Sequence, residues 1–337
     1  MRKRFSIILI IIIILLVLLS PAPALSGMHD GITLCLRSLI PSIFPLLFMI
    51  ALLSQHVGNR PSNERNRFLK PLGLNNGSDS IFILSVISGY PVGAVTIQDF
   101  LERGLIRKQD ANRLMSFCNN AGPAYIFGIS TLLFHANWVA WIVWGIQIIS
   151  SCLVAVIMPK TSCCFMNNER TYPKKSVTEI MAKSVRSIAI ICGWVLIFRV
   201  VAEYVKVFLR DIFPVCYIVT IHGILELTNG CIGLRSISAE ALRFVLFNTF
   251  LSFGGLCVWM QIFSAAKNLI TKQFYCGKAL QTIFSFGLSF IAQSIIFKDS
   301  IEMRYLPITT ITCSILIGIL VVILKQKNSG KIRINDV

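Results

Sequence analysis

The sequence predicts an all-α polytopic membrane protein, with about eight transmembrane helices and two re-entrant helical hairpins in an inverted repeat. Three observations predict this fold. Hydrophobic residues make up 55% of the 337 residues and charged residues only 14%, with a mean hydropathy of +0.73, which is more apolar surface than a soluble core absorbs. Two apolar segments are broken by glycine, proline and polar residues. The order of the segments also repeats on either side of one polar loop.

Apolar runs of membrane-spanning length predict the helices. They cover residues 5–25, 41–57, 114–133, 138–158, 187–205, 243–266, 279–297 and 306–324. The basic start, apolar run and Ala22-Pro23-Ala24 of the first one also fit a cleavable secretion signal. We favour a retained N-terminal helix over residues 1–25, because the apolar stretch extended to Leu25 is long enough to span a bilayer.

Two shorter or broken segments, at 80–101 and 212–232, predict the hairpins. The first contains Ser88–Ala94 (SGYPVGA), and the span that follows it is interrupted at Asn119–Pro123 (NNAGP). A broken helix survives in hydrocarbon only where protein or a water-filled cavity receives the freed backbone groups. These breaks therefore indicate a site.

The basic residues sort between the two membrane faces if both hairpins return to the side from which they enter. On that topology 24 lysines and arginines lie on one face and 7 on the other, with Arg199 inside a span. The excess predicts that both termini are cytoplasmic. Because topology accounts for the net charge of +17, we predict no nucleic-acid partner.

The polar loop 159–186, which is cytoplasmic and basic, divides the chain into two predicted repeats. The first covers 41–158 and the second 187–297. Each consists of a span, a hairpin, an interrupted span and another span, and the second runs in the opposite direction. A helix at 306–324 and a basic cytoplasmic tail at 325–337 follow. Inverted repeats of this kind place a substrate near the bilayer midplane, where half-helix ends meet.

Four motifs, in this order, carry a resemblance to a known family: SGYPVGA at 88–94, FCNNAGP at 117–123, LELTNG at 225–230 and SFGGLCVWMQ at 252–261. Together they resemble the sporulation integral membrane protein YlbJ family of the Gate, or nucleoside-recognition, superfamily. The resemblance implies a multi-pass protein of the bacterial cytoplasmic membrane, in the forespore or the mother cell, that serves spore maturation. It also implies a fold related to concentrative nucleoside transporters and ferrous-iron permease gates, without implying a nucleoside as substrate.

The candidate site residues lie at the hairpin tips and helix breaks that these motifs define. They are Tyr90, Pro91, Gly93, Asn119, Asn120, Pro123, Glu226, Thr228, Asn229, Gly254, Gly255 and Gln261. Amides donate and accept hydrogen bonds and hydroxyls adapt to either role, so the set fits a pocket for a neutral polar solute. The asparagines fit solute contact and turn bracing about equally. The glycines and prolines act through backbone shape.

Glu226 has two interpretations. A carboxylate in an interrupted apolar segment is costly, and such residues commonly pair or relay protons, so Glu226 could couple transport to H⁺ or Na⁺. It could instead brace its hairpin by accepting backbone hydrogen bonds. The residues alone leave both interpretations open.

Four further positions have structural interpretations. Arg199 and Glu203 lie four apart on one helix and predict an ion pair. Asp99 fits an ordinary interfacial charge. His222 fits a satisfied structural histidine better than a proton carrier.

No cofactor or metal site is predicted. The eleven cysteines lack the paired C-x-x-C spacing of metal ligands. The chain also lacks a P-loop, a zinc-protease helix motif and a nucleophile elbow, so we expect no enzyme and regard an intramembrane enzyme as a remote alternative.

We therefore expect a gate-type permease for a small polar solute in bacterial sporulation. Its partners would be the lipid bilayer and an unidentified solute, with H⁺ or Na⁺ as the candidate coupling ion. The alternative is a non-transporting assembly or signalling protein of spore formation with the same fold. Homo-oligomers and other sporulation membrane proteins remain open as further partners.

Overall fold

A computed structural model of the chain describes residues 11, 13–57, 70–74, 78–159 and 176–297. Within these ranges every regular element is a helix, so the fold is all-α as the composition predicts. Several predicted segments lie partly or wholly outside the described residues, namely the start of 1–25, most of the 159–186 loop, the helix at 306–324 and the tail at 325–337.

Five described helices are long and apolar enough to cross a membrane. They are Pro21–Gln55, Trp138–Ile157, Val177–Leu209, Glu240–Ala265 and Lys272–Ile296. These helices indicate a membrane-embedded protein, in agreement with the prediction.

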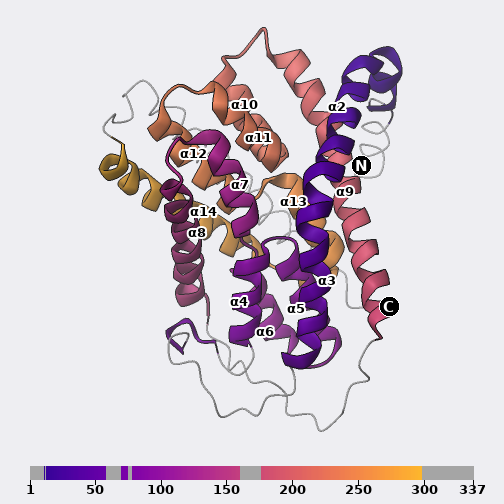
Figure 1. The fold of residues 1–337 in the computed structure, drawn as a ribbon, viewed down its shortest axis with the longest axis vertical. Helices are drawn as coiled ribbons and strands as arrows, with labels where there is room; N and C mark the ends of the chain where they lie inside the picture. The colour runs from indigo at the N-terminus through magenta and orange to yellow at the C-terminus, as the bar shows by residue number, and fades with distance from the viewer. Residues whose placement is uncertain (1–10, 12, 58–69, 75–77, 160–175, 298–337) are drawn as a thin grey trace, which may run out of the picture.

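The N-terminal part of the described chain is nearly continuous helix. It consists of α2 (Pro21–Leu34), a π-helical turn η1 (Cys35–Leu39) and α3 (Ile40–Val57). Residues 26–40, which lie outside the predicted spans, are helical. Both α2 and α3 pack along α9 (Val177–Leu209), as Figure 1 shows on the right of the molecule. With 33 residues, α9 is about 50 Å long, so it extends beyond a hydrocarbon core of about 30 Å.

Each of the two broken segments forms a pair of short helices. The first pair is α4 (Ser78–Ser88) and α5 (Val92–Glu102), and the second is α10 (Val215–Leu225) and α11 (Leu227–Gly233). The members of each pair pack against each other. An eleven-residue helix rises only about 16 Å, roughly half the hydrocarbon thickness. In Figure 1 the first pair lies at the lower end of the molecule and the second at the upper end.

The first interrupted helix consists of α6 (Lys108–Met115) and α7 (Pro123–Leu133), separated by the non-helical residues 116–122. We call residues 116–122 the first break. The chain then continues through α8 (Trp138–Ile157), which packs against α7.

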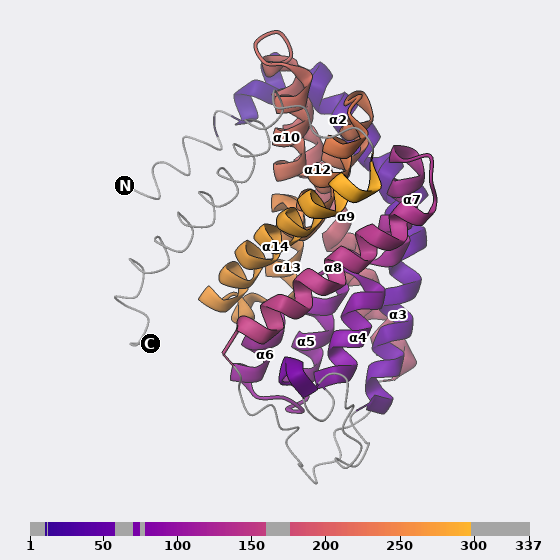
Figure 2. The same ribbon diagram turned by 90° about the vertical axis from the view of Figure 1, so that its left-hand side faces the viewer.

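The second interrupted helix consists of α12 (Glu240–Phe253) and α13 (Gly255–Ala265), which meet at Gly254. We call this junction the second break. It is followed by α14 (Lys272–Ile296), which packs against α12 and α8. Figure 2 shows α14 and α8 running side by side across one face of the molecule.

The core surrounds the second interrupted helix. In the most apolar window of Glu240–Ala265, 89% of the residues are buried inside the protein, whereas the other candidate spans keep broad apolar surfaces exposed. A buried helix faces protein on all sides, and an exposed apolar helix faces lipid. Both breaks therefore lie in protein rather than at the lipid boundary. Short 3-10 turns complete the fold: η2 (Lys70–Leu72), η3 (Leu234–Ser236) and η4 (Lys267–Leu269).

Candidate functional site

The turn between α4 and α5, residues 89–91, forms the first hairpin tip and is docked on the first break. Gly89 has a φ of +77° and packs so closely against the backbone of Gly122 that a β-carbon would overlap its nitrogen. The backbone N–H of Tyr90 donates a hydrogen bond to the carbonyl oxygen of Asn120 at 2.7 Å. The Tyr90–Pro91 peptide bond is cis. Glycine is needed at 89 because it alone combines this backbone conformation with this close approach.

The Tyr90 side chain connects the first tip to the second break. Its hydroxyl donates to the carbonyl oxygen of Leu251 at 3.4 Å. Its ring lies 5.8 Å from the ammonium nitrogen of Lys278, measured to the ring centroid. One tip thus contacts both breaks.

Three different elements satisfy the last carbonyl groups of α12. The hydroxyl of Tyr90 reaches Leu251, the ammonium of Lys278 reaches Ser252 at 3.0 Å, and the indole N–H of Trp259 reaches Phe253 at 2.8 Å. A helix end leaves such carbonyls without intrahelical partners, and in a dry interior each bare one is costly. The second break is therefore stabilised by side chains from three parts of the protein outside α12.

The two asparagines of the first break mainly brace it. The side-chain amide of Asn119 donates to the Met115 carbonyl at 3.0 Å, and that of Asn120 donates to the Phe117 carbonyl at 3.0 Å and the Ser151 hydroxyl at 3.2 Å. The side-chain oxygen of Asn120 accepts from Gln281 at 2.6 Å. The side-chain oxygen of Asn119 is buried and has no hydrogen-bond partner among the described residues. The Asn119 oxygen thus keeps both lone pairs free of described hydrogen bonds, whereas the Asn120 oxygen uses one.

Glu226 forms the second hairpin tip, between α10 and α11. Its carboxylate oxygens accept the backbone N–H groups of Thr228 at 3.0 Å and Asn229 at 2.8 Å, which caps α11. The same carboxylate lies 3.6 Å from Nε of Arg199 on α9. The bracing interpretation of Glu226 thus has a direct structural basis, and the residue is also charge-paired.

The predicted ion pair between Arg199 and Glu203 is wrong. Arg199 pairs instead with Glu226, and Glu203 pairs with Lys206 at 3.2 Å. A spacing of four residues along a helix permits contact between Arg199 and Glu203. An unpaired charge costs more at the buried carboxylate of Glu226 than at the less buried Glu203, so pairing with Glu226 is favoured.

The second tip is docked on the second break and touches α7. Gly255 has a φ of +74°, and a β-carbon there would lie 3.1 Å from the backbone nitrogen of Leu227. The hydroxyl of Tyr125 on α7 donates to the Thr228 hydroxyl at 3.4 Å. Hydroxyl groups of α7 and α11 therefore meet at the second tip, and the hydroxyl of Tyr90 reaches the second break from the first tip.

The remaining predicted residues have local roles. Gly93 packs in the first turn of α5 against the Cys118 carbonyl, and Pro123 occupies the first turn of α7. Gln261 lies about two turns beyond the second break and donates to the sulfur of Cys257 at 3.4 Å on its own helix. His222 is buried, with Nε2 3.1 Å from the Ala202 carbonyl, as a structural histidine would be.

Lys278 is the charged residue of this centre that the sequence prediction missed. The charge count assigned it to the cytoplasmic loop, but it lies in the second turn of α14 with 1% of its surface exposed. A signal was available, because the buried polar residues of α14 recur at helical spacing. They are Lys278, Gln281, Thr282, Ser285, Ser289 and Gln293.

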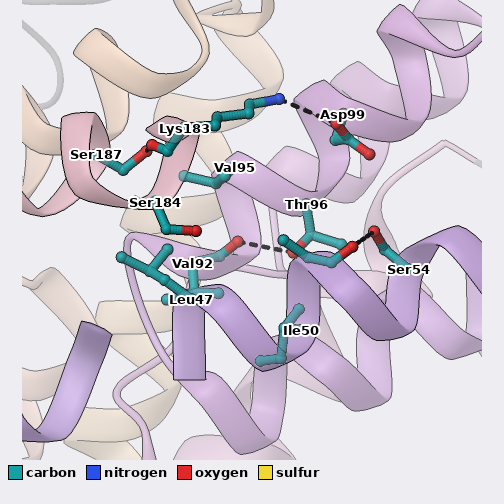
Figure 3. A pocket seen from close by; sticks show the side chains of 11 residues that line it. Leu47, Ile50, Ser54, Val92, Val95, Thr96, Asp99, Lys183, Ser184 and Ser187 are labelled. Atoms are coloured by element: carbon teal, nitrogen blue, oxygen red, sulfur yellow. Dashed lines mark hydrogen bonds and ion pairs between the residues drawn. The ribbon is translucent and has the colours of Figure 1, made fainter. Parts of the chain in front are cut away.

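A second cluster of charges lies apart from the tips, at a small cleft lined by α3, α5 and α9. Figure 3 shows Lys183 of α9 reaching Asp99 of α5, with 3.0 Å between the ammonium nitrogen and the carboxylate. Glu102 lies 3.5 Å from the same ammonium, and Arg103 lies 3.7 Å from Asp99. These charges join the first hairpin to α9.

Comparison with known proteins adds no relative: no family model matches this sequence, and no curated protein or solved structure has significant similarity to it.

Proposed function

We propose that this chain is a permease of the bacterial cytoplasmic membrane that moves a small polar solute through a gate formed by two hairpin tips. One observation carries the proposal. Both tips dock on helix breaks in a buried, polar centre, where Tyr90 contacts both breaks. Broken helices at membrane depth are typical of the substrate sites of secondary transporters.

The order of the helices supports an inverted repeat. The first set is α3, the α4–α5 pair, the α6–α7 pair and α8, and the second set is α9, the α10–α11 pair, the α12–α13 pair and α14. The hairpins lie at opposite ends of the molecule in Figure 1, which is what repeats of opposite direction require. On this proposal the fold is related to the Gate proteins and concentrative nucleoside transporters.

The chemistry of the centre favours a neutral solute. Glu226 is paired with Arg199, and the Lys278 ammonium is already bound by three oxygens, so these charged groups are engaged within the protein. The unpartnered Asn119 oxygen can accept a hydrogen bond, and the hydroxyls of Tyr90, Tyr125 and Thr228 can donate or accept. A set of neutral hydrogen-bond donors and acceptors of this kind matches an amide, a polyol or a nucleobase better than an ion.

The family resemblance of the four motifs supports a role in bacterial sporulation. We place the permease in the forespore or mother-cell membrane, with both termini in the cytoplasm, and we propose that its solute serves maturation of the spore envelope. The direction of movement follows from which compartment holds the solute.

Uptake into proteoliposomes tests the proposal. Radiolabelled amides, polyols and nucleosides would be offered under H⁺, Na⁺ and no gradient, with Thr228→Val compared with Thr131→Val. Both changes remove a hydroxyl at nearly constant shape, but Thr131 is exposed on α7 and bonds its own helix, whereas Thr228 is buried beside Tyr125. We expect uptake of at least one solute class, reduced by Thr228→Val only. If no solute enters under any gradient, the chain is not a permease.

A second candidate function has its own observation. Most polar groups of the centre, including Glu226, Asn120 and Lys278, are satisfied by neighbouring protein groups, as in a static brace. A protein that assembles or signals at the spore envelope needs no more than this. Residues 177–186 of the predicted 159–186 loop belong to α9, so the segment to test is 160–175. Spore maturation would then survive Thr228→Val but fail when residues 160–175 are replaced by a neutral linker. Permease function predicts that Thr228→Val impairs maturation.

A further inference from the structure

Lys278 occupies a site whose geometry is that of a cation site. Its ammonium donates to the backbone carbonyl of Asn119 at 2.6 Å, to that of Ser252 at 3.0 Å and to the side-chain oxygen of Gln281 at 3.1 Å. An ammonium has three donors, and all three are used. Oxygens from the first break, the second break and α14 thus converge on one positive charge.

No carboxylate balances this charge within the described part of the chain. Among the ion pairs of the described residues, none includes Lys278, although the side chain is almost completely buried. A buried charge without compensation is strongly unfavourable, so the compensation comes from dipoles. Ser252 lies in the last turn of α12, where the helix dipole places partial negative charge, and the Tyr90 ring presents its electron-rich face within 6 Å.

Carbonyl oxygens at the C-terminal ends of interrupted helices are also what transporters with broken helices use to coordinate a coupling cation. In this chain that arrangement is complete, but the cation is covalently attached. The Lys278 ammonium bridges the carbonyl of one break to the carbonyl of the other, as a bound alkali ion would.

We propose that Lys278 is the tethered cation of this site, that it takes the place of a free Na⁺ or K⁺ ion, and that the wild-type protein binds no alkali ion there. The inference deepens the proposed function, since its meaning for coupling depends on transport, but occupancy of the site can be measured without transport. Removing the side chain beyond its β-carbon would leave three oxygen ligands around a space that a small monovalent cation can enter.

Thermal unfolding of the purified full-length protein tests the proposal. Wild type, Lys278→Ala and Lys278→Met would be compared in NaCl, KCl, methylammonium chloride and choline chloride at equal ionic strength. Lys272→Ala is the matched control, because Lys272 belongs to the same helix but is exposed. Choline is too large for the site, and methionine fills the space without a charge.

We expect wild type and Lys272→Ala to unfold at the same temperature in all four salts. Lys278→Ala should unfold several degrees lower in choline and regain part of the loss in methylammonium or an alkali salt, whereas Lys278→Met should gain nothing from any cation. The proposal is overturned if Lys278→Ala shows no cation-selective gain, or if Lys278→Met gains as much as Lys278→Ala.

Should neither variant fold, the wild-type protein still decides. A stabilisation of wild type by Na⁺ or K⁺ relative to choline, reduced in Gln281→Leu, would mean that a free ion occupies the oxygen site and would overturn the proposal. The same temperature in all salts for both proteins supports it. None of these readouts depends on solute uptake, so loss of the permease proposal and loss of the tethered-cation proposal are separable results.

Discussion

Arg199 of α9 and Glu226 at the α10–α11 turn form an ion pair of 3.6 Å in which the two side chains are 11% and 4% exposed. The carboxylate also accepts two backbone N–H groups of α11. One buried acid therefore fixes the shape of the second hairpin tip and ties it to the 33-residue helix α9. Breaking a buried pair by removing one partner costs more than the pair contributes, because the other charge is left uncompensated.

Glu226→Ala should lower the free energy of unfolding by about 3–5 kcal/mol. The change leaves the Arg199 guanidinium unpaired and two backbone donors of α11 without an acceptor. Adding Arg199→Met should recover part of this loss, which a double-mutant cycle in detergent measures. Glu203→Gln is the matched control, since Glu203 pairs with the exposed Lys206 and should cost less than about 1 kcal/mol. Equal costs at 203 and 226 would contradict the assignment.

Gly89→Ala should destabilise the first hairpin tip by about 2 kcal/mol or more. A left-handed residue with a β-carbon costs about 1–2 kcal/mol, and contact with the Gly122 backbone adds to it. Gly128→Ala on α7 is the control, because a β-carbon added there would have no atom within 4 Å, and the change should stabilise the protein by about 0.5–1 kcal/mol. Changes of opposite sign in the free energy of unfolding of the two variants, measured by equilibrium unfolding, would verify the close approach of residues 89 and 122.

Tyr90→Phe should cost about 1 kcal/mol of unfolding free energy, because the Leu251 carbonyl loses its donor while the ring keeps its place. Tyr217→Phe, at a half-buried position whose hydroxyl has no described hydrogen bond, should be neutral within about 0.5 kcal/mol. Hydrogen exchange at the end of α12 adds a local readout, which should accelerate in the first variant only.

Lys183→Ala should increase local opening at the C-terminal end of α5 with little effect on global stability. The Lys183 pairs with Asp99 and Glu102 are partly exposed, so the change should cost less than about 1 kcal/mol and should matter less in high salt. Hydrogen exchange in α5 should rise relative to α11 at low salt. An equal increase of hydrogen exchange in both helices would argue against a local effect of the Lys183 ion pairs.

Cysteine labelling tests the proposed orientation. In a cysteine-free background, Arg210→Cys between α9 and α10 should react with an impermeant maleimide in intact cells, whereas Lys108→Cys at the start of α6 should react only after permeabilisation. Positive-inside topology places the second position in the cytoplasm. The reverse labelling pattern would mean that the protein has the opposite orientation in the membrane.

The breaks and hairpins could be predicted because glycine and proline act locally, and each leaves its mark within a few residues, as in SGYPVGA. The continuous helix from α2 to α3 was missed because Asp30 and Arg37 interrupt the apolar run. The ion-pair partner of Arg199 could not be predicted from the sequence. Glu203 lies four residues away and Glu226 lies 27 residues away, and only the packing of α9 on α10 selects Glu226. Lys278 was missed because a lysine at the edge of an apolar segment is usually solvated, and its compensation comes from backbone carbonyls that no residue pattern reveals.

The carbonyl contacts at the end of α12 also set a condition on any motion of the first hairpin. Tyr90 is the donor for Leu251, so withdrawal of this tip would uncover an acceptor in a region that otherwise excludes solvent. Water or a donor group of a bound polar solute can replace the lost hydroxyl there. Withdrawal of the tip therefore requires that water or a polar solute enters the centre at the same time.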